Sequence, residues 1–136
     1  MTRVLIDTHV FLWMQTDPER LGGAIDVLED SATAVHLSAA SSWEISIKWS
    51  LGKLRLPESP ITYIPDRMLR ARIDGLPVQH RHAVAVAELP LHHRDPFDRL
   101  LVAQAMVERI PLVTADPAMR PYPVQLIQVA VEPRTQ

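Results

Sequence analysis

Short, mostly aliphatic runs alternate along the chain with longer segments in which apolar residues recur at helical spacing. The runs at residues 4–6, 35–37 and 112–114 are bounded by polar residues and have too few positions for a helix. Continuous apolar runs of this length indicate strands that are buried on both faces, as parallel sheets require. Weaker runs at residues 76–78 and 124–129 predict two further strands.

Helical segments lie between these predicted strands. Spacing of apolar residues predicts helices around residues 9–15 and 21–30, and over residues 38–51, 60–74 and 80–89. Pro65 is expected to interrupt the fourth of these. The clearest helix begins at Asp95-Pro96, because aspartate is a good N-cap and proline suits the first helical position. Strands alternating with helices predict an α/β fold with a parallel sheet covered on both faces.

Composition limits the possible classes of protein. The chain has 136 residues, of which 47% are hydrophobic and 22% charged, and it shows no repeat or linker, so we expect one domain over residues 1–136. The apolar start is interrupted by Asp7, which argues against a secretory signal, and no apolar stretch is long enough to cross a bilayer. The absence of cysteine fits a reducing cytoplasm.

Acidic residues stand at four junctions between predicted elements. Asp7 and Asp116 follow strands, while Glu44 and Asp98 lie in the first turns of helices. In an open α/β sheet, ligands collect beyond the carboxyl ends of the strands, so these side chains are expected to converge. Converging carboxylates repel one another unless a cation joins them, and oxygen ligands favour Mg²⁺ or Mn²⁺. The pattern therefore indicates a metal-dependent enzyme that acts on a phosphodiester.

Each acid also has a structural explanation. Glu44 could form an S-x-x-E capping box with Ser41 or an ion pair with Lys48. The helix dipole would stabilise Asp98, and Asp116 could cap a short helix. Asp7 is harder to explain, because a lone acid at the end of a buried strand is costly to desolvate. The combination favours one shared site over four unrelated structural roles.

The formal net charge of −2 argues against a general nucleic-acid binder. Without the four candidate acids, the formal net charge becomes 14 − 12 = +2. A bound cation would neutralise much of the acidic site, so the negative total does not exclude an RNA substrate. Basic side chains gather in two places, and either group could contact RNA phosphates. The two groups are Lys48, Lys53 and Arg55, then Arg67, Arg70 and Arg72.

Histidines and tryptophans suggest other sites only weakly. The spacings within the pairs His80/His82 and His92/His93 match no zinc motif. The three tryptophans could stack on RNA bases, but Trp13 and Trp43 have aliphatic neighbours at helical spacing and are expected in the core. Both roles stay open for Trp49.

Four short motifs together resemble the PIN-domain family. They are VLIDTH at residues 4–9, SAASSWEI at 38–45, DPFDRLL at 95–101 and LVTAD at 112–116. The resemblance is greatest to VapC-like ribonuclease toxins of toxin–antitoxin pairs, and it covers nearly the whole chain in the expected order. It implies a three-layer α/β/α sandwich around a central parallel sheet.

The resemblance also implies roles for individual residues. Asp7, Glu44, Asp98 and Asp116 would form the catalytic set that holds Mg²⁺ or Mn²⁺, with Thr8 and Thr114 supporting it. Asp95 competes with Asp98 for this role, and we prefer Asp98 because capping already explains Asp95.

The implied activity is hydrolysis of RNA phosphodiester bonds by a metal-activated water. The implied partners are a small antitoxin whose tail covers the acidic groove and a second copy of the chain. Three alternatives remain: a PIN-domain RNA-processing nuclease without an antitoxin, a phosphoacceptor signalling domain, and a catalytically silent module that binds RNA or protein. The phosphoacceptor reading lacks paired acids near the first strand and a lysine beside the last.

Overall fold

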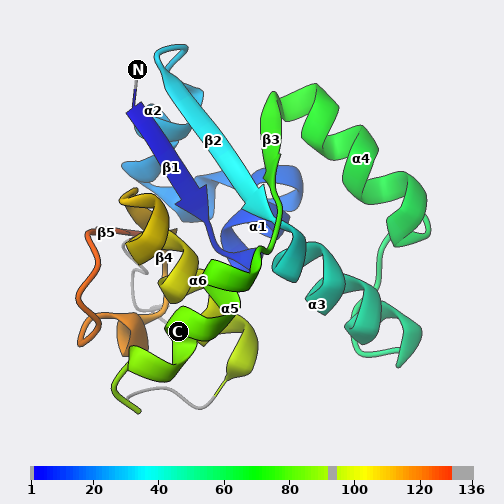
Figure 1. The fold of residues 1–136 in the computed structure, drawn as a ribbon. Coiled ribbons are helices and arrows are strands. Elements are labelled where there is room, and N and C mark those ends of the chain that lie inside the picture. Colours follow the sequence, from blue (N-terminus) through cyan, green and yellow to red (C-terminus); the bar gives the residue numbers. More distant parts are fainter. Residues whose placement is uncertain (1, 92–94, 130–136) are drawn as a thin grey trace, which may run out of the picture.

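Parallel strands form a sheet in the order β3-β2-β1-β4-β5 (Figure 1). The computed structural model describes residues 2–91 and 95–129. Within them the strands are β1 Thr2–Ile6, β2 Thr33–Ser38, β3 Ile73–Leu76, β4 Leu112–Thr114 and β5 Leu126–Gln128. The chain builds outward from β1 to β3 and then crosses back to place β4 on the other side of β1. This reversal makes the carboxyl ends of β1 and β4 the switch point, where α/β folds bind ligands.

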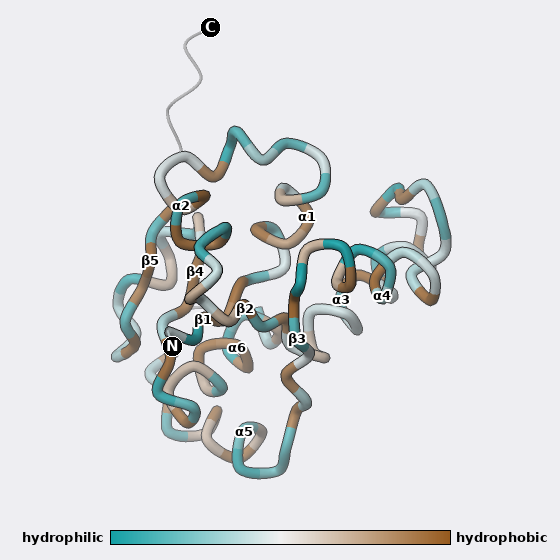
Figure 2. Tube along the Cα trace, turned by 90° about the horizontal axis from the view of Figure 1, so that it is seen from above, coloured by the Kyte–Doolittle hydropathy of each residue, from teal (hydrophilic) through white to brown (hydrophobic). Residues whose placement is uncertain are grey.

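Helices cover both faces of the sheet. They are α1 Thr8–Thr16, α2 Ala24–Glu29, α3 Ala39–Ser50, α4 Pro60–Ala71, α5 His80–Ala85 and α6 Pro96–Glu108, with 3₁₀ turns at Pro18–Leu21, Val86–Glu88 and Pro117–Met119. Figure 2 shows α1 and α2 on one side of the strands and α5 and α6 on the other. The described part of the chain therefore has the three-layer α/β/α arrangement expected from the sequence.

Alternate residues of β1 belong to separate hydrophobic clusters. Val4 and Ile6 pack in the cluster with α1, α2 and α4, whereas Leu5 packs in the cluster with α6. All three are fully buried, because successive side chains of a strand point to opposite faces and both faces are covered. The unbroken apolar run of β1 is thus the direct consequence of its central position.

The strand predicted at residues 76–78 begins earlier, as β3 Ile73–Leu76. Arg72 has a left-handed conformation with φ 56°, which ends α4 and leaves Ile73 extended. Pro77 has no N–H with which to continue the ladder, so the strand stops before it. Pro65 was expected to interrupt the preceding helix, but α4 continues through it with the loss of one backbone donor.

Two other expectations were wrong in detail. The helix predicted over residues 21–30 is divided, because Gly22 adopts φ 53° after a 3₁₀ turn and α2 starts only at Ala24. Trp43 was expected in the core and is 60% exposed, whereas Trp13, also expected there, is half-buried and packs against the core. Along residues 2–91 and 95–129, no helix has the length and apolar character that crossing a membrane requires.

The C-terminal end of α6 is tied to α5 by a buried histidine. The Gln79 N–H donates to His82 Nδ1 at 3.0 Å, so Nε2 carries the proton and donates to Glu108 at 3.0 Å. Arg81 also pairs with Glu108, and Arg3 lies 3.7 Å from it. The hydrogen bond from His82 is the main cause that lowers the pKa of Glu108 below its usual value. His82 is accordingly a structural residue of the α5–α6 contact.

Replacing Glu108 with Gln should make stability less dependent on pH in acid. A carboxylate with a lowered folded pKa stabilises the fold above its unfolded pKa, and that contribution is lost as the pH falls through the folded pKa. We expect Glu108→Gln to cost about 1 kcal/mol at pH 7, since the arginine partners are half-exposed and screened. The difference from the wild type should shrink below pH 4, as measured by urea unfolding. An equal loss at pH 7 and pH 3 would contradict this account.

Candidate active site

Asp7 is held by three elements at the carboxyl end of β1. Its backbone N–H donates to the Val113 carbonyl of β4 at 3.0 Å. Its Oδ1 accepts the Val10 N–H at 2.8 Å and so caps α1, while its Oδ2 accepts the Thr114 hydroxyl at 2.5 Å. The side chain is therefore fixed in orientation while β1, β4 and α1 bury it.

Burial raises the pKa of Asp7, because a charged carboxylate loses hydration there. The hydrogen bonds from Thr114 and Val10 and the nearby His9 oppose this shift, whereas the charge of Asp116 adds to it. The protein thus keeps a carboxyl group where its ionised form is unfavourable in the absence of a cation. Asp7 has a capping role, but capping alone does not require such burial.

Asp116 stands beside Asp7 at the end of β4. Its backbone N–H donates to Thr114 Oγ1 at 3.0 Å, so one hydroxyl group connects Asp116 with Asp7. Its Oδ1 accepts the Ala118 N–H at 2.9 Å and caps the 3₁₀ turn, as the structural alternative predicted. The Thr114 hydroxyl group thus lies between the Asp7 carboxylate and the Asp116 backbone.

Glu44 is buried in α3 and is bound on both carboxylate oxygens. The Thr8 hydroxyl lies 2.7 Å from Oε1, and the Lys48 ammonium donates to Oε2 at 2.7 Å. The capping-box explanation was wrong, because β2 ends at Ser38 and this residue, not Ser41, caps α3. Thr8 also lies 3.0 Å from Ser41 Oγ, a contact that no sequence signal indicated.

Asp98 lies in the first turn of α6, next to its cap. Asp95 Oδ1 accepts the N–H groups of Phe97 at 2.8 Å and Asp98 at 3.3 Å, which confirms the predicted capping role of Asp95. Phe97 packs edge-on against Trp43 with ring centroids 5.3 Å apart, so the start of α6 rests on α3. This contact brings Asp98 towards the part of α3 that carries Glu44.

Lys48 is the cation on this side of the site. Its pKa is raised mainly by the hydrogen bond to Glu44, and the charges of Glu44, Asp95 and Asp98 add to the effect. The i,i+4 spacing of Glu44 and Lys48 had predicted the ion pair. The extra influence of Asp95 and Asp98 depends on how α6 packs against α3, which spacing cannot show.

The acids form two neighbouring groups at the same edge of the sheet. The charges of Asp7 and Asp116 act on one another, while Glu44 and Asp98 both act on Lys48. Thr8 joins the groups, since it follows Asp7 in the chain and contacts Glu44. Among the described residues, no three histidine, aspartate or glutamate side chains are close enough to hold one metal ion. The predicted set therefore shares one edge but not one tight cluster.

The chemistry of these donors nevertheless fits Mg²⁺ or Mn²⁺. Magnesium sites need only one or two carboxylates, because water and substrate phosphates complete the octahedron. Asp7 and Asp116 provide such a pair, and a cation beside them would offset the burial that disfavours the Asp7 carboxylate. Zinc fits less well, because His82 is committed to Glu108. His92 and His93 lie outside the described residues.

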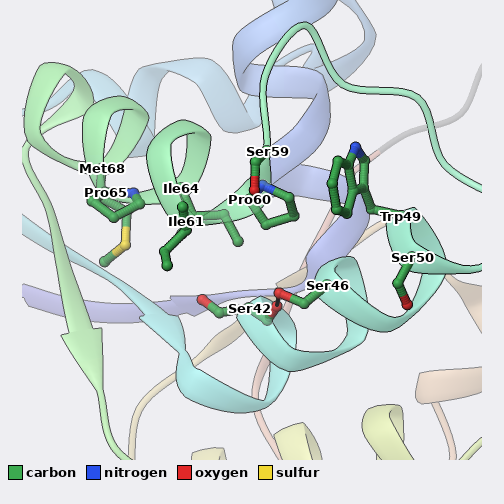
Figure 3. Close-up of a pocket in the computed structure, with 10 residues that line it drawn as sticks. All are labelled: Ser42, Ser46, Trp49, Ser50, Ser59, Pro60, Ile61, Ile64, Pro65 and Met68. Atoms are coloured by element: carbon green, nitrogen blue, oxygen red, sulfur yellow. Dashed lines mark hydrogen bonds between the residues drawn. The ribbon is translucent and has the colours of Figure 1, made fainter.

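An apolar groove, with no acidic residue in its lining, runs along α3 and α4 (Figure 3). Its volume is about 560 Å³. Figure 3 shows Trp49 at one end, and Ile61, Ile64, Pro65 and Met68 along the α4 side. Ile61 is 85% exposed and lies beside the other apolar residues of the groove, so it belongs to a contiguous apolar patch, the kind of surface that marks interaction sites.

Known proteins match this chain in sequence and in fold. A family model for the PIN domain matches residues 4–124. Ribonuclease VapC22 of Mycobacterium tuberculosis is 29% identical over 122 residues, which are 90% of this chain and 93% of that protein. Ribonuclease VapC16 of the same organism is 46% identical over 56 residues, 41% of this chain and only 40% of that protein.

Solved structures agree on the fold. VapBC2 from Rickettsia felis, bound to a promoter DNA fragment, matches with a TM-score of 0.71 at 13% identity, covering 93% of this chain and 98% of that chain. A toxin–antitoxin complex from Klebsiella pneumoniae matches with a TM-score of 0.65 at 15% identity, with the same two coverages of 93% and 98%. At such identities the likeness establishes the three-layer fold.

Replacing Asp7 with Asn should not destabilise the metal-free protein at pH 7. The amide oxygen can still cap α1, and the unfavourable buried charge is removed. A carboxyl whose folded pKa is raised costs stability above its unfolded pKa, so the variant should gain up to about 2 kcal/mol at pH 7. The gain should disappear below pH 4. Unfolding in EDTA would measure it.

Glu58→Gln, a change at an exposed carboxylate of the loop before α4, is the matched control and should alter stability by less than about 0.5 kcal/mol. A clear loss of stability in Asp7→Asn at pH 7 would mean that the ionised carboxylate is needed for folding.

Proposed function

The chain belongs to the PIN-domain family, and from this premise we propose that it is a metal-dependent endoribonuclease and the toxin of a toxin–antitoxin pair. Residues 1–136 would be one nuclease domain. Two relatives are named ribonucleases, and one of them aligns with nearly the whole chain. A structural neighbour is a toxin–antitoxin complex. The observation that carries the proposal is a buried Asp7 beside Asp116 at the switch point of the sheet.

Asp7 and Asp116 would hold Mg²⁺ or Mn²⁺ from the β1 and β4 side, and Glu44 and Asp98 would complete the acidic set from α3 and α6. When bound, the ion would neutralise charge on the scissile phosphate and lower the pKa of a water molecule, so that the resulting hydroxide can attack the phosphorus atom. Thr114 would orient Asp7, and Thr8 would orient Glu44, since both hydroxyl groups contact those carboxylates directly. Lys48 would offset the charge of Glu44 and keep its second oxygen in place.

The α3–α4 groove would receive the antitoxin. An apolar groove of this kind suits the apolar face of an amphipathic helix. A basic tail that continues from such a helix could reach Glu44 on α3 and Asp98 at the start of α6, which packs against α3. Pairing with a second copy of the chain is a further part of the proposal, and the exposed Trp43 and Leu51 are candidates for that contact.

Purified protein should cleave RNA with Mg²⁺ or Mn²⁺ and stop in chelator. Asp7→Asn and Asp98→Asn should each reduce cleavage by about 100-fold or more, because each removes a charge from the acidic set. Asp95→Asn should keep most activity and cost about 1 kcal/mol of stability, since its oxygen caps α6. Cleavage rates with a labelled RNA and parallel unfolding curves would measure both effects.

Two results would change the assignment. An inactive Asp95→Asn with unchanged stability would move the catalytic role from Asp98 to Asp95. A well-folded wild type with no metal-dependent cleavage would favour the silent binding module.

Ile61→Asp should weaken binding of the antitoxin by about tenfold or more, because it puts a charge into an apolar contact. Leu69→Asp is the matched control, since Leu69 lies on the same helix, is 81% exposed and does not line the groove. Both variants should cut RNA like the wild type. Calorimetric titration would measure the affinity, and equal affinities of the two variants would exclude the groove as the docking surface. A PIN nuclease without an antitoxin would offer no partner to titrate.

A further inference from the structure

A second cavity, of about 390 Å³, opens between α1, α3 and the loop at residues 51–57 that precedes α4. One wall carries His9 and Trp13 of α1, and the facing wall carries Lys53 and Arg55 of the loop. Lys48 also lines it. A volume of this size lies in the range of about 300–1,000 Å³ that is usual for small-molecule sites. We call it the α1–loop cavity.

The charge of the α1–loop cavity is positive. Lys48, Lys53 and Arg55 line it, and none of its lining residues is acidic. Lys48 is paired with Glu44, but neither Lys53 nor Arg55 forms an ion pair with the residues that the structure describes, and both are exposed. Two available cations at one mouth favour an anionic ligand, and Arg and Lys are the usual contacts to RNA phosphates.

The other wall is aromatic and apolar. The His9 and Trp13 ring centroids lie 6.0 Å apart, and Arg20, which does not line the cavity, covers the Trp13 ring at 4.3 Å from its centroid and holds it in place. Leu54 and Leu56 add aliphatic surface. A planar base fits such a wall, because bases splayed out of a strand stack on aromatic side chains and on Arg. A base held in a duplex could not enter.

The α1–loop cavity adjoins Glu44 through two of its lining residues. Thr8 lines the cavity and contacts Glu44, and it follows Asp7 in the chain. Lys48 lines the cavity and pairs with Glu44. A nucleotide bound in the cavity would therefore place the neighbouring phosphate of its strand at the acids.

We propose that the α1–loop cavity binds one unpaired nucleotide of the RNA substrate, next to the phosphodiester that is cut. Lys53 and Arg55 contact its phosphate, and the His9–Trp13 wall contacts its base. This inference rests on the proposed ribonuclease function and adds to it the residues that hold the nucleotide beside the cut.

The test uses Lys53→Gln/Arg55→Gln in the full chain. Its affinity for a labelled single-stranded oligoribonucleotide is measured by anisotropy in EDTA, with Asp7→Asn present in all proteins to prevent cleavage. We expect the dissociation constant to rise about tenfold, and the slope of log affinity against log salt to become less steep by about 0.7, as expected when one phosphate of a single strand loses its contacts. Folding is checked by thermal unfolding, which should be unchanged because both side chains are exposed.

Arg72→Gln/Arg109→Gln is the matched control. It removes the same charge from two exposed residues that follow α4 and α6 at the opposite edge of the sheet. Its dissociation constant should stay within about twofold of the wild-type value. Both double variants lose the same net charge, so any effect of long-range electrostatic attraction alone would be equal in the two. Equal weakening in both would overturn the proposal, because the effect would then be one of net charge.

The base contact is tested with oligoribonucleotides that lack one base at successive positions. Removing a single base beside the cut should weaken binding by fivefold or more, as about 1 kcal/mol or more is lost per stacked base. A uniform response along the strand, or equal affinity for a fully paired duplex, would overturn the proposal.

Other outcomes separate this inference from the proposed function. Unchanged RNA affinity in Lys53→Gln/Arg55→Gln, together with metal-dependent cleavage by the wild type, would overturn the inference alone. If the same variant lost affinity only for the antitoxin, the cavity would belong to an acidic segment of that partner. A wild type that neither binds nor cuts RNA would overturn both.

Discussion

The hydrogen bond from Thr114 to Asp7 joins the ends of β4 and β1 where the strand order reverses. The buried Oδ2 atom of Asp7 thereby gains a hydrogen-bond donor. The same bond fixes the carboxyl group at the end of the sheet. Asp7 then starts α1, and Thr8 extends the connection to Glu44 of α3. Elements that are distant in sequence are thus arranged around one buried acid. The proposed chemistry requires that the rest of the fold offsets the free energy of desolvating the Asp7 carboxylate.

Residues with strictly local causes were predicted well from the sequence. The buried runs of β1 and β4 and the capping of α6 by Asp95 depend on neighbours in the chain, and all are present. The α/β class follows from the alternation of these elements. Where a second local signal competed, the prediction failed: the left-handed Arg72 and Pro77 moved β3, and Ser38 replaced Ser41 as the cap of α3.

The arrangement of the site depends on packing between elements, which sequence pattern does not contain. The placement of all four acids at the same edge was expected, yet their division into Asp7 with Asp116, and Glu44 with Asp98 around Lys48, comes from how α6 rests on α3. Likewise, the basic residues after Glu44 were visible as a group. Their position opposite the His9–Trp13 wall required the fold.

The ion pair of Lys48 with Glu44 has a consequence for how the protein is made. An ammonium group on the same helix is a tethered counterion that travels with the newly synthesised chain, so α3 can fold before any divalent cation is acquired. The Glu44 carboxylate is thus balanced within its own helix, before the divalent ion of the proposed chemistry is bound.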